Sequence, residues 1–334
     1  MKYKTVLVPL TMPLVLAACL GGGGGSSGSG WKNFTSFDNI NPNQRVQFQS
    51  GGGSVNYAGT AAAPGASVDR AGTYSNEGAR LRVRYGPDTS EEPEVVEFEI
   101  DSLELTVNLP DGSVARTFDG ENVAAVAGAP RFQEARIFAL DEEGEPTEDV
   151  TDRLYAADID AQGLEYMTFG LWELGLDGTE RNIGGAAFGR TTLAFNNGAL
   201  PVDTVTYNGD LIGYNVVAEG SFVYVADSEL VANFATSAVN FTSENTRTLG
   251  GADRSGFDIT ANGTISGDTF SGTDLTLGGN LAGVFEAEFG GAFFGPNAAE
   301  AGGWFEVTNT DPGANLNDRY FGSFGGARGE IAEP

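Results

Sequence analysis

The chain has 334 residues, and its 46 acidic and 18 basic side chains give a formal net charge of −28; it has no histidine and one cysteine. This charge excludes a nucleic-acid partner for the folded body, because nucleic-acid affinity comes largely from Lys and Arg that displace counterions. The lack of histidine excludes a Ser-His-Asp triad, a Cys-His dyad and imidazole metal sites, and a single cysteine excludes an intramolecular disulfide. The 49 glycines indicate many tight turns or linkers.

Residues 1–18 have the composition of a bacterial lipoprotein signal peptide. Lys2 and Lys4 precede an apolar stretch that is shorter than the roughly 20 residues a membrane-spanning helix needs. The stretch ends in Leu-Ala-Ala-Cys, which resembles the lipobox, and Cys19 is the only cysteine of the chain. We therefore predict cleavage before Cys19 and a covalent diacylglyceryl lipid on its thiol. Apart from this lipid, no cofactor and no metal is expected.

Residues 19–30 are predicted to be the lipidated cysteine and a flexible Gly/Ser tether. Leu20 stands where an aspartate often signals retention in the inner membrane, so we expect an outer-membrane lipoprotein with its body exposed at the cell surface. Removal of the leader takes away two lysines and no acid. The mature chain then has 16 basic and 46 acidic side chains and a net charge of −30.

Residues 31–195 are predicted to form a β-rich domain. Apolar and polar residues alternate over Val96–Asp101 and, with the opposite parity, over Leu103–Asn108, so a β-bulge or bend is expected at Asp101-Ser102. The sequence Leu-Pro-Asp-Gly-Ser at 109–113 predicts a turn.

The second half of this domain gives weaker patterns. The acidic stretch Asp141–Glu145 predicts a solvated loop rather than a calcium site, because its spacing does not fit an EF-hand. Glu148–Arg153 is interpreted as one or two helical turns. The aromatic-rich Tyr166–Glu173 predicts a strand with a bend or close backbone approach at Gly170. Ile183–Arg190 is interpreted as a strand end or a connector.

Residues 196–201 are rich in turn-forming residues and predict a domain boundary. Beyond Asp203, short strands follow one another at a spacing typical of a barrel, and about eight such strands can close on themselves. We expect residues 201–334 to fold alone. The predicted strands are Thr204–Tyr207, Tyr214–Val217, Ser221–Val225, Leu230–Phe234, Ala238–Thr242, Phe257–Ala261, Thr264–Ser266, Thr273–Leu277, Val284–Phe289, Trp304–Val307 and Phe321–Phe324.

Two turns and a set of aromatic residues complete the prediction for this barrel. Asn262-Gly263 and Ser266-Gly267-Asp268 predict hairpin turns. Because eight strands enclose just enough room for side chains, the interior is expected to be filled rather than to hold a deep ligand pocket. The aromatic residues available to fill it are Phe222, Tyr224, Phe234, Phe241, Phe285, Phe289, Phe293 and Phe305.

Residues 290–305, GGAFFGPNAAEAGGWF, and 321–328, FGSFGGAR, resemble the signature of the β-barrel domain of transferrin-binding protein B and its relatives. The stretches around residues 206–213 and 265–272 resemble the opening strand and a hairpin of the same barrel. The matching signature residues are Phe293, Phe294, Gly295, Pro296, Ala298, Glu300, Gly302, Gly303, Phe305, Phe324, Gly325, Gly326 and Arg328.

This resemblance implies an all-β architecture, with a handle-like β domain over residues 31–195 and an eight-stranded antiparallel β-barrel over residues 201–334. The group also includes factor H-binding protein-type lipoproteins. The chain is half the size of the two-lobed transferrin receptor, so transferrin specificity is not implied. Pro296 is expected to end the strand after Phe294. Glu300 is expected to accept backbone N–H bonds within its own loop; contact of this loop with a ligand is the alternative.

An enzymatic function is not expected. Glu286 and Glu288 lie two residues apart on one strand face, which places their carboxylates about 6–7 Å apart, a separation that overlaps that of glycosidases. The same alternation recurs at Glu97 and Glu99, however, and is typical of any half-buried strand. The sequence has no phosphate-binding loop, nucleophile elbow or redox pair, so we predict no catalytic residues.

Three functions remain open. In the first, the chain is a receptor lipoprotein that captures a protein or solute, such as an iron source, alongside a TonB-dependent outer-membrane receptor. In the second, it binds a host protein in adhesion or immune evasion. In the third, it is a coat component without a ligand. The acidic loops around Glu91–Glu94 and Asp141–Glu148 are the expected contact features for a basic partner, although solvation alone also explains an excess of acids.

Overall fold

The computed structural model describes residues 31–41, 43–59, 73–75, 78–85, 100–109, 112–176, 181–195, 199–217, 220–279, 285–309 and 319–329. The predicted signal peptide, Cys19, the Gly/Ser tether and the acidic segment Glu91–Glu94 lie outside the described residues. Residues 31–334 form one structural unit. Within the described part of this unit, no helix has both the length and the apolar character needed to cross a bilayer.

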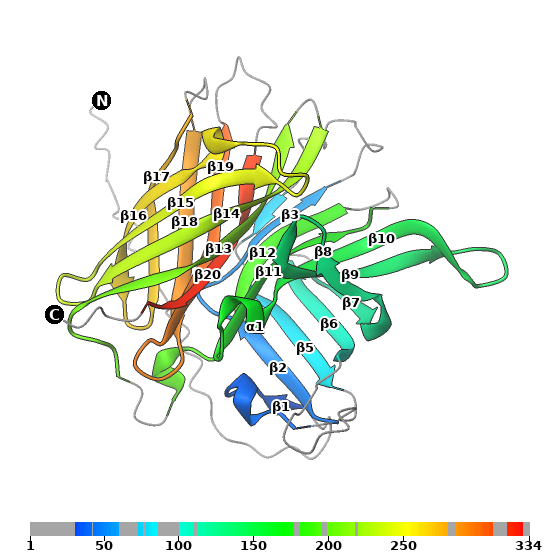
Figure 1. Cartoon of the computed structure of the whole chain (residues 1–334), viewed down its shortest axis with the longest axis horizontal. Coiled ribbons are helices and arrows are strands. Elements are labelled where there is room, and N and C mark those ends of the chain that lie inside the picture. Colours follow the sequence, from blue (N-terminus) through cyan, green and yellow to red (C-terminus); the bar gives the residue numbers. More distant parts are fainter. Residues whose placement is uncertain are drawn as a thin grey trace, which may run out of the picture. The chain divides into compact units, whose positions relative to one another are not determined.

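The C-terminal part is a closed antiparallel barrel in which eight strands follow one another in chain order and the last pairs with the first (Figure 1). This confirms the predicted all-β fold with an eight-stranded barrel. The strands are β13 (Thr204–Val217), β14 (Gly220–Asn233), β15 (Ala238–Thr248), β16 (Ile259–Ser266), β17 (Thr269–Leu277), β18 (Phe285–Phe294), β19 (Glu300–Asn309) and β20 (Arg319–Arg328).

The eleven short strands expected from the sequence are wrong in their boundaries. Thr204–Tyr207 and Tyr214–Val217, for example, are the two ends of the single long strand β13. Glycine and polar residues between them suggested a break, but they continue the ladder with β20. Gly209 is required there by close packing, because a Cβ atom at this position would lie 2.0 Å from the carbonyl oxygen of Gly325.

One of the two predicted hairpin turns is confirmed. Ser266-Gly267-Asp268 joins β16 to β17, and Gly267 has the positive φ, 62°, that the turn needs. Asn262-Gly263 is instead inside β16, so this expectation was wrong. The pairing with β17 shifts register between Asn262 and Thr264, which is a bulge rather than a turn.

Aromatic side chains fill the barrel, as expected. Phe241 and Phe324 are stacked with their ring centroids 4.1 Å apart, and Phe234 and Phe293 lie 4.8 Å apart. Phe222 is the exception, since it is 41% exposed near the N-terminal end of β14. The predicted residues that are fully buried in the barrel core are Tyr224, Phe241, Phe289, Phe293 and Phe305, with Phe234 and Phe285 partly buried against them.

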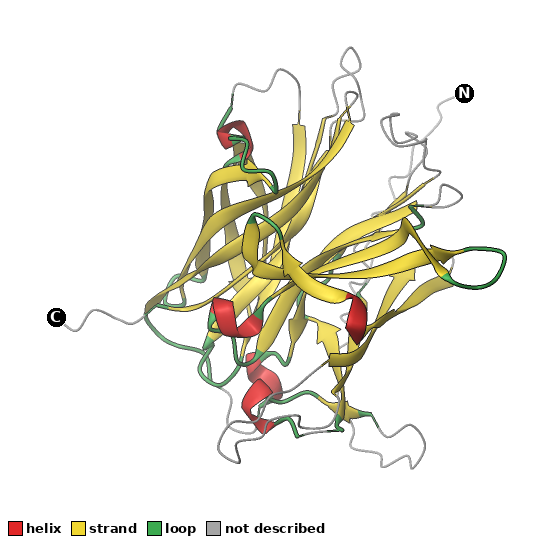
Figure 2. Cartoon of the chain, turned by 45° about the vertical axis from the view of Figure 1, so that its right-hand side comes forward, coloured by secondary structure: helices red, strands yellow, loops and turns green. Residues whose placement is uncertain are grey.

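The N-terminal part is a twelve-stranded sheet, here called the handle sheet. Nine strands follow one path: β7 (Gly112–Asp119), β6 (Ile100–Leu109), β5 (Ala79–Tyr85), β2 (Arg45–Ser50), β12 (Arg181–Gly189), β11 (Met167–Leu174), β10 (Pro146–Ala157), β9 (Ala129–Leu140) and β8 (Val123–Val126). Beside this path lie β1 (Lys32–Asn33), β3 (Val55–Gly59) and β4 (Thr73–Ser75). Helical structure in the described residues is limited to α1 (Ile159–Gln162) and four short 3₁₀ turns (Figure 2).

Pairing in this sheet confirms one local prediction and corrects two others. Arg84 pairs with Ser102 and Tyr85 with Ile100, so Asp101 is the extra residue of the predicted bulge. Glu148–Arg153 is not helical; it belongs to β10, because pairing with β9 and β11 overrides the local helical preference.

Ile183–Arg190 is not a connector, since residues up to Gly189 form the central strand β12. All eight residues of β11 and seven of nine in β12 are buried, so both faces of these central strands are covered. Met167, Phe169 and Leu171 of β11 pack with barrel residues on one face. On the opposite face, Trp172 and Leu174 pack with the rest of the handle sheet.

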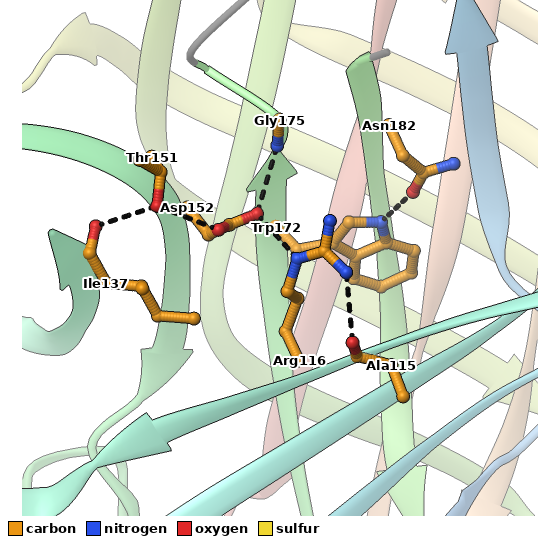
Figure 3. Close-up of polar contacts among 8 residues, drawn as sticks. All are labelled: Ala115, Arg116, Ile137, Thr151, Asp152, Trp172, Gly175 and Asn182. Carbon is orange, nitrogen blue, oxygen red and sulfur yellow. Dashed lines mark hydrogen bonds and ion pairs between the residues drawn. The ribbon is translucent and has the colours of Figure 1, made fainter. Parts of the chain in front are cut away.

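The handle sheet curls so that β7, at one end of the strand path, contacts β9 near the other end. A group of polar contacts joins these two parts of the sheet (Figure 3). Arg116 of β7 donates from Nε to Asp152 Oδ1 of β10, at 3.1 Å. The Gly175 backbone N–H donates to the same oxygen at 3.0 Å, and the Thr151 hydroxyl lies 3.0 Å from Oδ2. The Asp152 side chain is almost fully buried, at 7% exposure, so its charge is held by these partners.

Candidate binding surface

The signature turn joins β18 to β19 and faces the handle. As predicted, the strand ends at Phe294 just before Pro296. Gly295, Asn297 and Ala298 have positive φ values of 71°, 55° and 53°, which make the turn tight. A Cβ atom at Gly295 would lie 2.4 Å from the ring of Tyr166, so glycine is needed where the turn packs on the residues that precede β11.

Glu300 begins β19 and joins the barrel to the handle. Its carboxylate accepts hydrogen bonds from the backbone N–H groups of Glu165 and Tyr166, with the Tyr166 bond 2.9 Å long. The expectation that Glu300 bonds within its own loop was therefore wrong: its acceptors satisfy donors of a loop 135 residues away in the chain. Burial raises the pKa of the Glu300 carboxyl to about 7, against the opposing effect of these backbone donors.

Three further polar contacts cross the same junction. The Ser323 hydroxyl of β20 donates to the Gly170 carbonyl at 2.7 Å, and the Trp304 indole N–H donates to the Gly52 carbonyl at 2.9 Å. Arg131 pairs with the buried Asp210 of β13, with Nε 3.0 Å from Oδ2. The predicted close backbone approach at Gly170 is confirmed, because a Cβ atom there would lie 2.2 Å from the Tyr155 carbonyl oxygen.

Two acids face each other on the outer surface of the barrel. Glu306 of β19 pairs in register with Glu288 of β18 and is 7% exposed. Burial raises the pKa of Glu306 to about 7; the Arg319 charge and the Thr308 hydroxyl oppose this rise, and Glu288 adds to it. Burial thus raises the pKa of both Glu300 and Glu306 to about 7.

The two acids weighed for catalysis, Glu286 and Glu288, differ in exposure. Glu286 is exposed, whereas Glu288 is half-buried and faces Glu306. Among the described residues, no group of three or more Cys, Asp or Glu side chains is arranged to hold a metal ion.

Among the described residues, one accessible acidic feature is the hairpin between β9 and β10, which extends from the handle sheet (Figure 1). Asp141 fixes its turn by accepting from the backbone N–H groups of Glu143 and Glu145, at 3.0 and 2.8 Å. Residues 141–149 contain six acids and no base, and all residues from 141 to 146 are exposed. This part of the predicted acidic surface is thus ordered by its own backbone and presents its charge to solvent.

Comparison with known proteins agrees with this architecture. Residues 200–328 match a family model described as the C-lobe and N-lobe beta barrels of Tf-binding protein B. No curated protein matches the chain in sequence. The chain is a two-part all-β protein in which a curled sheet is joined to a closed barrel. The match over residues 200–328 confirms the resemblance to the transferrin-binding protein B barrel for this part of the chain.

Similar solved structures include a variant of transferrin-binding protein B from Haemophilus parasuis Hp5, with 13% identity and a TM-score of 0.40 over 86% of this chain and 76% of that one. A surface lipoprotein is 14% identical, with a TM-score of 0.37 over 60% of this chain and 99% of the other. Isotype 1 transferrin-binding protein B from serogroup B Neisseria meningitidis is 13% identical, with a TM-score of 0.35 over 86% and 77%. Scores this low carry no inference about a shared ligand.

Proposed function

We propose that the mature protein is a lipid-anchored lipoprotein of the outer-membrane surface that captures a protein ligand through its exposed loops. The observation that carries this proposal is that aromatic side chains pack against one another and fill the barrel. Because the interior is filled, we expect the ligand to contact the loops. The match of residues 200–328 to a family of binding proteins supports the same reading. A binding role needs no catalytic group.

The ligand we propose is a protein with a basic face. The net charge of −28 and the acid-tipped β9–β10 hairpin favour such a partner, because complementary charge raises the association rate. Capture of a nutrient source, such as an iron-bearing protein, is the biological role that we propose. A TonB-dependent outer-membrane receptor would then take up the nutrient.

The first prediction concerns the anchor. In cells labelled with radioactive palmitate, we expect label on the wild-type protein and none on the Cys19→Ala variant, because this is the only thiol. Extracellular protease should remove the wild-type body from intact cells, whereas the variant should not be retained at the outer membrane. Equal labelling of both forms would contradict the lipid anchor.

The second prediction concerns the hairpin. A variant with four hairpin glutamates replaced by Gln is expected to bind more slowly to the ligand that copurifies with the lipid-free protein. The association rate should fall about tenfold at low salt. The replaced residues are Glu142, Glu143, Glu145 and Glu148. The difference in association rate between this variant and the wild type should decrease as ionic strength rises, because salt screens the electrostatic attraction. The matched control removes four exposed barrel acids, Asp203, Glu229, Glu244 and Asp274. An equal loss in both variants, or no salt dependence, would refute a contact at the hairpin.

A further inference from the structure

The curled handle sheet forms an open cavity of about 800 Å³ on the face turned away from the barrel. Strands β2, β5 and β6 form one wall, and β9, β10 and β11 form the other. The segment Phe37–Asn41 and the start of α1 lie at its mouth. A volume of this size is within the range of roughly 300–1,000 Å³ that is typical of small-molecule sites.

Two small side chains on one wall of the cavity leave room opposite the larger side chains of β5. Leu81, Val83 and Tyr85 of β5 face into it from one wall. Ala135 and Ala156 line the opposite wall and leave the space between the walls open. Farther along the same strands, bulky residues such as Trp172 of Figure 3 close the interior.

The lining combines an apolar interior with an acidic mouth. Phe48 of β2 and Leu103 of β6 add to the apolar lining on one wall, and Leu154 of β10 adds to it on the other. Three carboxylates, those of Asp38, Asp158 and Asp160, belong to the lining, which contains no Lys or Arg. This arrangement excludes fatty acids, phosphates and other anions, because their charge would meet like charge in a partly desolvated space.

The three carboxylates differ in the hydrogen bonds and ion pairs that they already make within the protein. Asp158 accepts from the backbone N–H groups of Asp160 and Ala161 and from the Gln133 side chain, at 3.0–3.1 Å. Asp38 and Asp160 are exposed at the mouth, and no Lys or Arg in the described part of the chain pairs with either. Their charge is therefore available to a ligand.

We propose that this cavity binds a small hydrophobic cation, with its apolar body between β5 and β9–β10 and its ammonium group at Asp38 and Asp160. Burial of the apolar body against the leucine, valine and phenylalanine side chains supplies most of the affinity. The carboxylates at the mouth select the sign of the charge. This site is separate from the acidic β9–β10 hairpin proposed above as the protein contact, since no residue of 141–149 lines the cavity.

The test uses two fluorescent probes with the same dansyl group. Dansylcadaverine carries a primary ammonium group, whereas dansylglycine carries a carboxylate. Titrated into the lipid-free protein, dansylcadaverine is expected to gain fluorescence on binding and to bind at least tenfold more tightly than dansylglycine. Equal affinity for the two probes, or no binding of dansylcadaverine, would overturn the proposal.

Two kinds of variant locate the binding. The Asp38→Asn, Asp160→Asn double variant is expected to lose about tenfold in dansylcadaverine affinity, while the matched Asp203→Asn, Asp274→Asn variant on the barrel keeps wild-type affinity. Ala156→Leu should reduce binding of the probe by filling the cavity, and Ala135→Trp should do so more strongly. Circular dichroism reports whether each variant folds. Folded cavity-filling variants with unchanged affinity would place the probe elsewhere and refute the site.

Discussion

Replacement of Gly185 by valine is expected to lower the free energy of unfolding by about 3 kcal/mol, the upper end of the usual cost of overpacking. Gly185 lies in β12 where the handle sheet meets the barrel. A Cβ atom there would lie 2.8 Å from the carbonyl carbon of Gly322 and 3.1 Å from the backbone nitrogen of Ser323. Both contacts are with the backbone of β20, which is hydrogen-bonded to β19 and cannot turn away as a flexible side chain can.

The expected consequence is a shift of β12 away from β20 and weakening of the contacts on either side. The bond from Ser323 to Gly170 lies in the same junction and would lengthen or break. Urea unfolding followed by tryptophan fluorescence measures the loss. The matched control is Gly250→Val, because Gly250 is exposed and a Cβ there meets only the Thr248 hydroxyl oxygen, at 3.8 Å. If both variants are equally stable, the junction is not closely packed.

Features set by neighbouring residues were predictable from the sequence. The bulge at Asp101 follows from a change in the apolar pattern, and the turn at Gly267 follows from its residues. The eight-stranded closure was also predictable, although the strand ends were not. In β13, Gly209 suggests a break when considered alone, but contact with Gly325 from the other end of the barrel sequence keeps it in the ladder.

Features that depend on which distant segments meet were not predictable from the sequence. The sequence around Glu300 gives no sign that its partners are backbone amides of the loop before β11. The link from Arg116 to Asp152 depends on the curl of the whole sheet. The cavity depends on that curl too, because Ala135 and Ala156 line a cavity only when the curl brings β5 opposite them. Whether the barrel residues 201–334 fold without the handle stays a prediction.

The stability of the protein is expected to fall as pH rises from 5 to 8. Burial raises the pKa of both Glu300 and Glu306 to about 7 in the folded state, above the value of about 4.3 for an exposed glutamate. Between these values the folded protein keeps protons that the unfolded chain has lost, so the free energy of unfolding decreases with pH. The stabilisation is complete below the unfolded pKa and is lost as pH rises through about 7. Each group is expected to account for about 2–3 kcal/mol of the decrease in the free energy of unfolding between pH 5 and 8.

The Glu306→Gln variant isolates one of these contributions. Gln keeps an acceptor for the Thr308 hydroxyl and removes the charge that faces Glu288, so its stability should change less between pH 5 and 8 than that of the wild type. The matched Glu286→Gln variant removes an exposed charge from the neighbouring strand and should follow the wild-type curve. Urea unfolding at several pH values gives both slopes. If the Glu306 variant kept the wild-type slope, Glu306 would not contribute to the pH dependence, and Glu300 together with the overall repulsion among 46 acids would have to account for it.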